Sequence, residues 1–350
     1  MNTAGTNRFP YRNVLVIQTG FVGDMVLTTP LIRALRRGAG REASITLLHA
    51  PRTEGIVRLC PHVDRLVRFD KGGSERGTAS TLRLARRLRA ERFDLVISPH
   101  RSVRSGLLAF ATGAPRRVGF ERYPSSLFYT DTVPYSRWES TFVRRKLRLL
   151  EPLGIHEEDE TPEVYFGDAE AAEARRLLAG GNVRPPYAVL AVGSAWPTKQ
   201  WPPERFGALV PLLEKRGMAS VFVGGPGDRE AGRRAAKTGG GADLTGEMSF
   251  EVLGALLHGA SLFVGNDSGA FHLARGARTP AIALFGPTGP EQFRFDRLVR
   301  IVRSDAFCAP CSDHGSAECP LGHWICLPGI TETRVAAEAD RLLAEADRVR

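Results

Sequence analysis

Short runs of hydrophobic and β-branched residues alternate with stretches of helical periodicity along most of this 350-residue chain. Such alternation is typical of β-α-β units, in which helices cover a parallel sheet. In the first half, the pattern predicts strands at residues 14–18, 45–49, 65–69, 95–98 and 117–120. It predicts helices at residues 24–37, 78–92 and 138–150. The first half therefore has the pattern of an α/β domain.

The same pattern starts again at Tyr187, after a turn-rich and acidic passage at residues 154–168. It predicts strands at residues 188–192, 220–224, 262–265 and 281–285. It predicts helices at residues 203–215, 228–237, 250–258, 268–275 and 332–350. We therefore expect two Rossmann-like domains, residues 1–165 and 166–330, followed by a C-terminal helix at 331–350. Because parallel sheets bind ligands at the carboxyl ends of their strands, such domains predict a cleft in which the two sheets face each other.

Length and composition agree with two globular domains. The chain is 43% hydrophobic and 25% charged, which is typical of a folded protein rather than a disordered or fibrous one. Residues 1–11 are polar and lack the apolar core of a signal peptide. No apolar run approaches the roughly 18 residues that span a bilayer. We therefore expect a soluble, cytoplasmic protein.

Positive charge is concentrated in one part of the chain. The net charge is +10, and ten arginines lie between Arg76 and Arg117 against two acids, Glu91 and Asp94. Such a field attracts nucleic acid, an anionic membrane surface or an acidic substrate, although it also fits solvated helix faces. The basic residues lack interleaved aromatics and a helix-turn-helix pattern, which argues against nucleic acid.

The segment GNDSGAFH, from Gly265 to His272, is the most informative part of the chain. It places acidic, hydroxyl and small residues at a predicted strand-to-helix turn, where free N–H groups and a positive helix end favour an anion. Lys199 adds a single cation in a loop stiffened by proline and tryptophan, and lysine is a compact charge for phosphate. Together they predict a site for a nucleotide-diphosphate leaving group, neutralised without a metal. The alternatives are an exposed lysine and a histidine buried by packing.

Asp24 follows the first predicted strand in the sequence TGFVGD. The spacing Gly20-x-x-Gly23 lacks the full dinucleotide fingerprint, which argues against an NAD-dependent oxidoreductase. A carboxylate at the start of a helix favours the helix dipole, and that role alone explains an acid here. The functional alternative is a general base that takes the proton of an attacking hydroxyl.

Two further candidates lie beside predicted strand ends in the second half. Asp228 follows the glycine-rich sequence GGPG. It either binds ribose hydroxyls, as the acid of Rossmann folds does, or caps its helix. Met248 precedes a helix, and it either contacts a purine or packs in the core. A second Gly-Pro turn, FGPTGP, begins at Phe285 and could close over a bound donor.

Taken together, these segments resemble glycosyltransferase family 9, the bacterial ADP-heptose:lipopolysaccharide heptosyltransferases. The resemblance runs along most of the chain and depends on the order and spacing of the segments. The matching residues are Gly23-Asp24 with Thr29-Pro30, Lys199-Gln200-Trp201-Pro202 with Phe206, Asn266-Asp267-Ser268-Gly269 with His272, and Phe285-Gly286-Pro287-Thr288.

The resemblance implies a GT-B fold and a metal-independent, inverting transfer that requires no cofactor. It implies that Asp24 is the catalytic base and that Lys199 stabilises the leaving group. It implies an ADP-sugar pocket formed by Ser194, Lys199, Asp228, Met248, Asp267, Ser268, Gly269 and His272. It places the acidic acceptor near Arg104 and Arg122. Ser194 stands where close relatives often have threonine, and Ala195 lacks a hydroxyl that some have, so the chain departs from the family at one phosphate contact.

Four of the five cysteines form a cluster with the spacing Cys308-x2-Cys311-x7-Cys319-x6-Cys326, and two histidines, His314 and His323, lie within it. A cytosolic cluster this dense more often binds metal than forms disulfides. The spacing is not that of a standard zinc ribbon, so structural zinc, free thiols and disulfides all stay open. The cluster resembles a feature of the second-heptose branch of the family.

The sequence and the resemblance together predict an enzyme that transfers a heptose from ADP-heptose to the inner core of lipopolysaccharide. The lipid A-core acceptor would be presented at the cytoplasmic face of the inner membrane, where the enzyme would be peripheral. We expect a monomer without a nucleic-acid partner. The alternatives are a nucleotide-sugar epimerase, which needs no separate acceptor, and a non-catalytic protein that binds nucleotide sugar or lipid.

Overall fold

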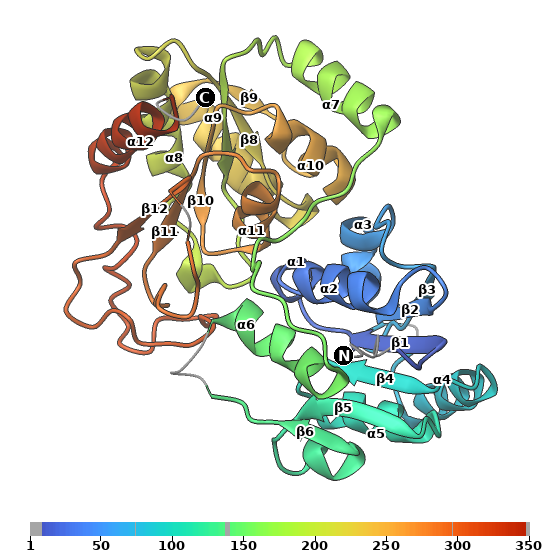
Figure 1. Ribbon diagram of the computed structural model, residues 1–350. Helices are drawn as coiled ribbons and strands as arrows, with labels where there is room; N and C mark the ends of the chain where they lie inside the picture. The colour runs from blue at the N-terminus through green and yellow to red at the C-terminus, as the bar shows by residue number, and fades with distance from the viewer. Residues whose placement is uncertain (1–8, 74, 137–140, 296, 348–350) are drawn as a thin grey trace, which may run out of the picture. The chain divides into compact units, whose positions relative to one another are not determined.

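The computed structural model describes residues 9–73, 75–136, 141–295 and 297–347. The chain divides into two compact units, Met1–Glu160 (unit 1) and Thr161–Arg350 (unit 2). Each unit contains a six-stranded parallel sheet with helices packed on it (Figure 1). The α/β class predicted from the sequence is therefore confirmed.

The sheet of unit 1 has the strand order β3-β2-β1-β4-β5-β6. Its strands are β1 (Asn13–Gln18), β2 (Ser44–His49), β3 (Arg65–Arg68), β4 (Leu95–Ser98), β5 (Arg116–Phe120) and β6 (Asp131–Val133). Its helices are α1 (Val22–Val26), α2 (Thr29–Ala39), α3 (Glu54–Val57), α4 (Thr78–Ala90), α5 (Val103–Ala111) and α6 (Phe142–Leu147). This is the strand order of a Rossmann fold, in which ligands bind where the order reverses, here between β1 and β4.

The sheet of unit 2 has the order β12-β11-β10-β7-β8-β9, which is the same arrangement when its strands are counted from β7. Its strands are β7 (Tyr187–Ala191), β8 (Ala219–Val223), β9 (Ala242–Asp243), β10 (Leu262–Asn266), β11 (Ala281–Phe285) and β12 (Val299–Arg303). Its helices are α7 (Asp168–Gly180), α8 (Pro203–Glu214), α9 (Arg229–Gly239), α10 (Phe250–His258), α11 (Gly269–Gly276) and α12 (Glu332–Asp347). The order reverses between β7 and β10.

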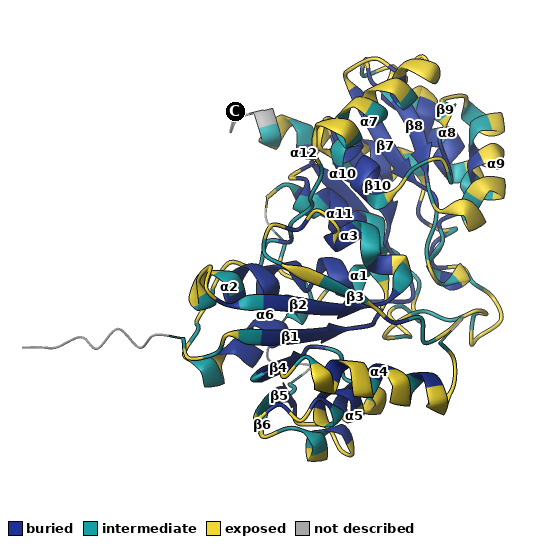
Figure 2. Cartoon of the chain, turned by 90° about the vertical axis from the view of Figure 1, so that its right-hand side faces the viewer, coloured by how far each residue is buried: buried dark blue, intermediate teal, exposed yellow. Residues whose placement is uncertain are grey.

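The central strands are buried, which explains why their sequences are continuous hydrophobic runs. Every residue of β4, β7 and β10 is buried (Figure 2). Every residue of β11 is buried as well, whereas the edge strand β3 is exposed at both ends. The C-terminal helix α12 contributes Val335, Ala339 and Leu342 to the core of unit 2. It is therefore part of that unit.

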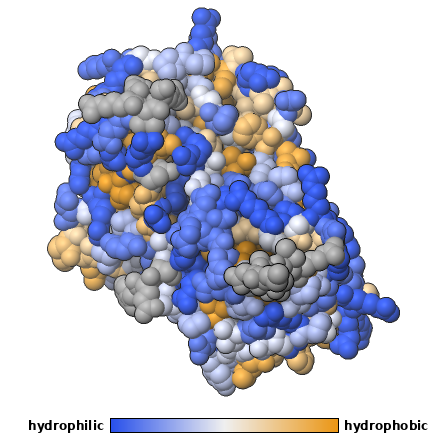
Figure 3. All heavy atoms as spheres, viewed as in Figure 1, coloured by the Kyte–Doolittle hydropathy of each residue, from blue (hydrophilic) through white to orange (hydrophobic). Residues whose placement is uncertain are grey.

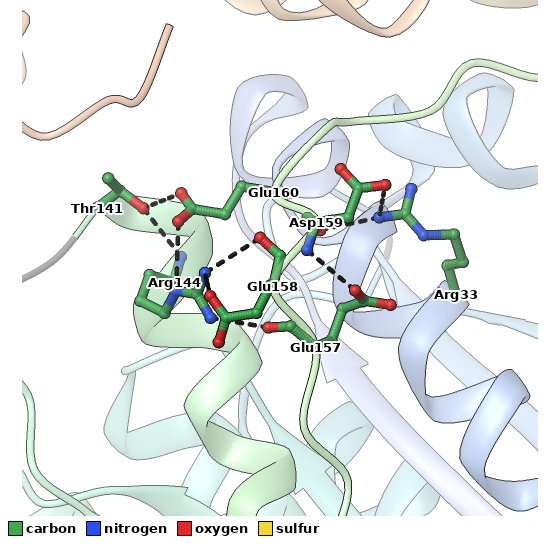
Figure 4. A network of polar contacts seen from close by, with 7 residues as sticks. All are labelled: Arg33, Thr141, Arg144, Glu157, Glu158, Asp159 and Glu160. Atoms are coloured by element: carbon green, nitrogen blue, oxygen red, sulfur yellow. Dashed lines mark hydrogen bonds and ion pairs between the residues drawn. The ribbon is translucent and has the colours of Figure 1, made fainter. Parts of the chain in front are cut away.

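The acidic passage after α6 is fastened to unit 1 (Figure 4). Asp159 forms an ion pair with Arg33 of α2 at 3.0 Å. Arg144 of α6 pairs with Glu158 at 2.6 Å and with Glu160 at 3.2 Å. Beyond Thr161 the chain packs on unit 2, because Val164 lies against the helix glycines at positions 254 and 276. These contacts explain why the division falls after Glu160, whereas the sequence pattern suggested residue 165.

The structure differs from the predicted elements at several points. The helix predicted at residues 24–37 is two helices, because Thr28 donates its hydroxyl to the carbonyl of Asp24 and Pro30 has no N–H for a continuous helix. The strands β6, β9 and β12 and the helices α3, α5 and α7 were not predicted. Of the predicted helix at 138–150, residues 138–140 lie outside the described residues, as do 348–350 of the last helix. After Leu147 the chain continues as a 3-10 turn, Arg148–Leu153.

Among the described residues, none of the helices has both the length and the apolar character needed to cross a bilayer. On the face shown in Figure 3, hydrophilic residues predominate and hydrophobic residues gather in separate areas. One such area is at the lower edge, in the part of unit 1 that carries β6 and α5 in Figure 1.

Candidate active site

In unit 2, the side chain of Asn266 joins the carboxyl ends of two central strands. It is fully buried at the end of β10. Its Nδ2 donates to the carbonyl of Val192, just after β7, at 3.0 Å, and its Oδ1 accepts from the backbone N–H of Trp201 at 2.9 Å. An amide suits this place because it both donates and accepts. Asn266 therefore fixes the loop that carries Lys199 to the end of β10.

Lys199 and Asp267 form an ion pair in which Lys199 Nζ lies 2.6 Å from Asp267 Oδ2. Thr288 Oγ1 donates to the same carboxylate oxygen at 2.8 Å. The two side chains of the pair are only 14% and 9% exposed. Lys199 is therefore not the isolated cation expected from its loop, because Asp267 neutralises part of its charge. A bound diphosphate would compete with Asp267 for the ammonium group.

The loop around Lys199 is braced by the cysteine-rich segment between β12 and α12. Thr198 N–H donates to the carbonyl of Ser316 at 3.3 Å, and Ser316 N–H donates to Thr198 Oγ1 at 2.9 Å. Trp324 Nε1 donates to the carbonyl of Thr198 at 3.2 Å. Gly315 comes so close that an added Cβ would lie 2.8 Å from Lys199 Cγ. The position of Lys199 therefore depends on the conformation of this segment.

The helix α11 begins where the sequence predicts an anion site. Ser268 is its N-cap residue and Gly269 its first helical residue. Among the residues that the structure describes, the buried hydroxyl of Ser268 has no hydrogen-bond partner. His272 is 4% exposed and packs against the rings of Phe271 and Phe293, at centroid distances of 5.2 and 5.0 Å. The helix start thus offers a hydroxyl and N–H groups to an anion, whereas the imidazole is enclosed by aromatic side chains.

Three other expected donor residues lie in unit 2. Asp228 caps its own turn, since its Oδ2 accepts from Gly225 N–H at 2.8 Å. The carboxyl group also lies against Gly193, where an added Cβ would be 2.1 Å from Oδ2, and burial raises the pKa of Asp228. Ser194 and Met248 are half-buried, so Met248 is not a core residue. Asp228 therefore has the capping role. Its carboxyl group also lies next to Gly193, which follows the end of β7.

In unit 1, Asp24 lies in the first turn of α1, shortly after β1. Its Oδ2 accepts from Phe21 N–H at 3.1 Å, which is the helix-start role considered from the sequence. Gly20 leaves room for this carboxyl group, because a Cβ on Gly20 would lie 2.7 Å from Asp24 Oδ2. Asp24 is half-buried, so it retains access to solvent.

Lys146 of α6 is a buried cation beside Asp24 that sequence reasoning missed. The residue is 6% exposed, and its Nζ donates to the backbone carbonyl of Asp24 at 2.8 Å. Thr28 Oγ1 donates to the same carbonyl at 2.6 Å. Burial lowers the pKa of Lys146 to about 8, although the charge of Asp24 opposes this effect. Because 122 positions separate the two residues, no local pattern could have linked them.

Lys71, His100 and Thr19 form a polar group whose charges interact with Asp24. Lys71 Nζ donates to Thr19 Oγ1 at 3.4 Å, and His100 Nδ1 lies 3.3 Å from the same oxygen. Burial lowers the pKa of Lys71, and burial together with the Lys71 charge lowers the pKa of His100 to about 4. His100 is therefore neutral at neutral pH. Each residue follows a strand, β1, β3 or β4, so the carboxyl-end rule could have found them.

Arg104 and Arg122, the expected acceptor residues, are both exposed. Arg104 lies in the first turn of α5, and its charge helps to lower the pKa of Lys71. Arg122 follows β5, and its carbonyl accepts from Ser125 Oγ at 2.8 Å. Arg104 therefore interacts electrostatically with Lys71 of the polar group around Asp24. For Arg122, the described contact is within the turn that follows β5.

The four clustered cysteines line one small cavity in unit 2. All are free thiols, so the disulfide alternative is not realised here. Hydrogen bonds from the backbone N–H groups of Trp324 and Leu321 lower the pKa of Cys319, whereas burial raises the pKa of Cys311 and Cys326. Within the described ranges, no three His, Cys, Asp or Glu side chains are arranged to hold a metal ion. Structural zinc therefore stays a prediction.

Two Rossmann-like units, each with polar side chains beyond the carboxyl ends of its central strands, are the architecture of many nucleotide-binding α/β enzymes. The sequence model of glycosyltransferase family 9 (heptosyltransferase) matches residues 81–324. The chain belongs to this family, as its motifs suggested, and it is therefore a glycosyltransferase.

Individual relatives agree with this assignment. The chain is 28% identical over 280 residues to lipopolysaccharide heptosyltransferase 3 of Escherichia coli, covering 77% of this chain and 82% of the relative. It is 25% identical over 349 residues to lipopolysaccharide heptosyltransferase 2 of Escherichia coli K12, covering 95% and 99%. The solved E. coli ADP-heptose LPS heptosyltransferase II has a TM-score of 0.77 at 22% identity, covering 96% of this chain and 99% of that chain. The GT-B fold is thereby confirmed, and a transferase is favoured over an epimerase.

Proposed function

We propose that this protein transfers a heptose from ADP-heptose to the inner core of lipopolysaccharide, with inversion at the anomeric carbon. The observation that carries the proposal is a family 9 chain with a half-buried carboxylate, Asp24, in unit 1 and the start of helix α11 beside the Lys199–Asp267 ion pair in unit 2. The names of the relatives include lipopolysaccharide and ADP-heptose, which supports these substrate classes.

Asp24 is the base in this reaction. As the acceptor oxygen bonds to the anomeric carbon, its proton passes to the carboxylate of Asp24. The bond between that carbon and the diphosphate oxygen breaks, and its electron pair leaves on ADP. Attack opposite the leaving group inverts the carbon. Lys146 supports this role because its hydrogen bond holds the backbone of Asp24.

The ADP-sugar is held by unit 2. The Ser268 hydroxyl and the first N–H groups of α11 face the diphosphate, and Lys199, oriented by Asp267, offsets the charge that grows on the leaving oxygen. The remaining donor residues are Ser194 and Gly269 at the phosphates, Asp228 at the ribose, Met248 at the base and His272 behind the helix start. Lys199 therefore acts mainly in the transition state, where the leaving group gains charge.

Neither a cofactor nor a divalent metal takes part in the proposed transfer. The support is that Lys199 and α11 already place positive charge where the diphosphate would bind. We expect turnover to be unchanged after treatment with a chelator. Loss of turnover that added Mg²⁺ restores would contradict this part of the proposal.

The acceptor is the anionic inner core of lipid A, presented at the cytoplasmic face of the inner membrane to a monomeric enzyme. Arg104 and Arg122 bind its acidic groups, and Lys71 supports this because its ammonium lies beside the group around Asp24. The cysteine cluster favours the second heptose. Truncated core acceptors that carry zero or one heptose test this choice.

The decisive experiment incubates the protein with ADP-heptose and each truncated acceptor, and it follows products by mass spectrometry. We expect one added heptose, and NMR should report the inverted anomeric configuration. A donor isomer formed without acceptor would indicate an epimerase. Binding of ADP without turnover on any acceptor would indicate a non-catalytic protein.

Asp24→Asn tests the assigned base. General-base removal should lower kcat about 10²–10⁴-fold, while ADP affinity stays the same. Asp168→Asn is the matched control, because Asp168 is also a carboxylate in the first turn of a helix, α7, but is exposed in unit 2. If Asp24→Asn keeps turnover within a few-fold of Asp168→Asn, another group is the base.

A further inference from the structure

The outer face of α5 is apolar although it is exposed. One side of this helix packs into unit 1, and the other presents Val103, Leu107 and Phe110, which are 42%, 45% and 56% exposed. Their spacing of four and three residues places them in one stripe. Surface helices normally carry polar residues on the side away from the core. The outer stripe of α5 is therefore a candidate interaction surface.

The short helix η2 (Ser125–Phe128) extends this face. Phe128 connects η2 to α5. The ring centroids of Phe128 and Phe110 are 6.1 Å apart, and a Cβ added to Gly106 would lie 2.9 Å from Phe128 Cδ2. Leu127 and Tyr123, nearby in the chain, are 69% and 81% exposed. The α5–η2 surface is defined here as the exposed apolar residues Val103, Leu107, Phe110, Tyr123 and Leu127.

Exposed arginines flank the α5–η2 surface. The helix α4 packs against α5 and has no acidic residue in its sequence TASTLRLARRLRA. The exposed arginines of α4 and of the surface itself are Arg83, Arg86, Arg87, Arg89, Arg104 and Arg122. None of these six forms an ion pair with a described residue.

The acids of the same region offset only part of this charge, since Glu91 also attracts Arg87. Glu91 is paired with Arg65 at 2.9 Å, and Asp94 accepts hydrogen bonds from the backbone at the start of β1. Glu121, beside Arg122, is the acid nearest the surface along the chain. The combination of exposed apolar side chains with exposed guanidinium groups that form no ion pair with a described residue suits a partner that is apolar within and anionic at its surface.

We propose that the α5–η2 surface and the flanking arginines dock unit 1 on an anionic lipid bilayer. The apolar side chains enter the boundary between headgroups and acyl chains, and the arginines of α4 contact lipid phosphates, whereas Arg104 and Arg122 bind the acceptor in the proposed function. Charge decides against a second copy of the chain, because two such surfaces would face each other with like charges. With nine residues, α5 lies on the bilayer and does not span it. Docking would bring the enzyme to an acceptor that is anchored in the bilayer by lipid, and this purpose rests on the proposed function.

Sedimentation of the full-length protein with vesicles tests the apolar part of the surface. The vesicles contain phosphatidylglycerol and phosphatidylcholine, with no donor and no acceptor. We expect Leu107→Asn combined with Phe110→Asn to weaken binding by at least about tenfold, since two apolar side chains no longer enter the bilayer. Phe307→Asn is the control, because Phe307 is 85% exposed but lies in unit 2. Equal binding by wild type and the double variant would overturn the proposal.

A second pair of variants tests the arginines, and its control removes the same number of positive charges elsewhere. Arg86→Gln combined with Arg87→Gln lowers the net charge from +10 to +8, since two positive charges are removed. It should weaken vesicle binding by about fivefold per arginine. Arg175→Gln combined with Arg184→Gln gives the same net charge from exposed positions in unit 2. An equal loss in both pairs would mean that only the overall charge matters, and it would overturn the docking surface.

Three further measurements keep the result unambiguous. Circular dichroism checks folding, and Tyr123→Asn with Leu127→Asn on the η2 side replaces the α5 pair if that pair misfolds. Sedimentation velocity that finds a dimer lost in the α5 pair, without vesicle binding, would assign the surface to a second copy and overturn the proposal. Transfer to a deacylated, water-soluble acceptor should be equal in all these variants. If the wild type transfers no heptose to this acceptor, the proposed function is contradicted, but the vesicle-binding result still tests the docking surface.

Discussion

Replacing Lys146 with methionine removes a buried charge whose cost can be worked out from its surroundings. Burial lowers the pKa of Lys146 from 10.5 to about 8. One pH unit corresponds to about 1.4 kcal/mol, so the charged ammonium costs about 3 kcal/mol in the folded state. Its hydrogen bond to the Asp24 carbonyl returns about 1.5–3 kcal/mol. That carbonyl keeps a partner in the variant, because Thr28 Oγ1 also donates to it.

At about pH 7 we therefore expect Lys146→Met to change the free energy of unfolding by less than about 2 kcal/mol. The pH dependence is the sharper result. Between about pH 8 and 10.5 the unfolded chain binds the lysine proton and the folded protein has lost it, so the folded wild type gains stability as pH rises. Wild type should gain about 2–3 kcal/mol relative to the variant between about pH 7 and pH 10.

Urea unfolding followed by circular dichroism at several pH values measures this difference. Lys215→Met is the control, because Lys215 is exposed and should show no such pH dependence. A wild-type advantage that stays constant from neutral to alkaline pH would refute the reasoning. In the transfer assay, Lys146→Met should lower kcat/KM by about tenfold or more, since the Asp24 carbonyl loses one of its two hydrogen bonds and the carboxylate loses a nearby positive charge, and about 1.4 kcal/mol suffices for that factor.

Three other substitutions test unit 2. Asn266→Ala removes a buried amide and leaves the Trp201 N–H without its acceptor, so the free energy of unfolding should fall by about 2–4 kcal/mol in urea titrations. Lys199→Ala should raise the donor KM and lower kcat by at least about tenfold, and unchanged values would remove Lys199 from the diphosphate site. Cys319 should react with iodoacetamide before Cys311 below about pH 9, because the pKa of Cys319 is lowered while that of Cys311 is raised, and peptide mass spectrometry reports the order. Faster labelling of Cys311 would contradict this.

The elements that sequence alone predicts well are those whose own composition decides their structure. The buried strands β1, β7, β10 and β11 contain short continuous hydrophobic runs, as expected of strands covered on both faces. Short edge strands such as β6 and β9 were missed, because few hydrophobic residues mark them. The break between α1 and α2 was also missed, although Pro30 marks it in the sequence.

Some features of the candidate site could also be predicted from the sequence, and others could not. The turn at Ser268 and Gly269 was found from sequence, because a helix start after a strand attracts anions whatever surrounds it. The ion pair of Lys199 was not found, because it requires the fold to bring Asp267 to 2.6 Å from the lysine.

By itself, then, the sequence determined the α/β class, the repeated strand-helix order and the family, because these follow from local composition and from motifs in a fixed order. Only the tertiary structure decided which charges meet. Lys146, on helix α6, reaches Asp24 across 122 positions. Asn266 ties β10 to the chain after β7, because parallel sheets bring distant strand ends to one edge. Burial at that edge then alters the pKa of Lys146 and of His100, and burial is a property of the folded chain rather than of any segment.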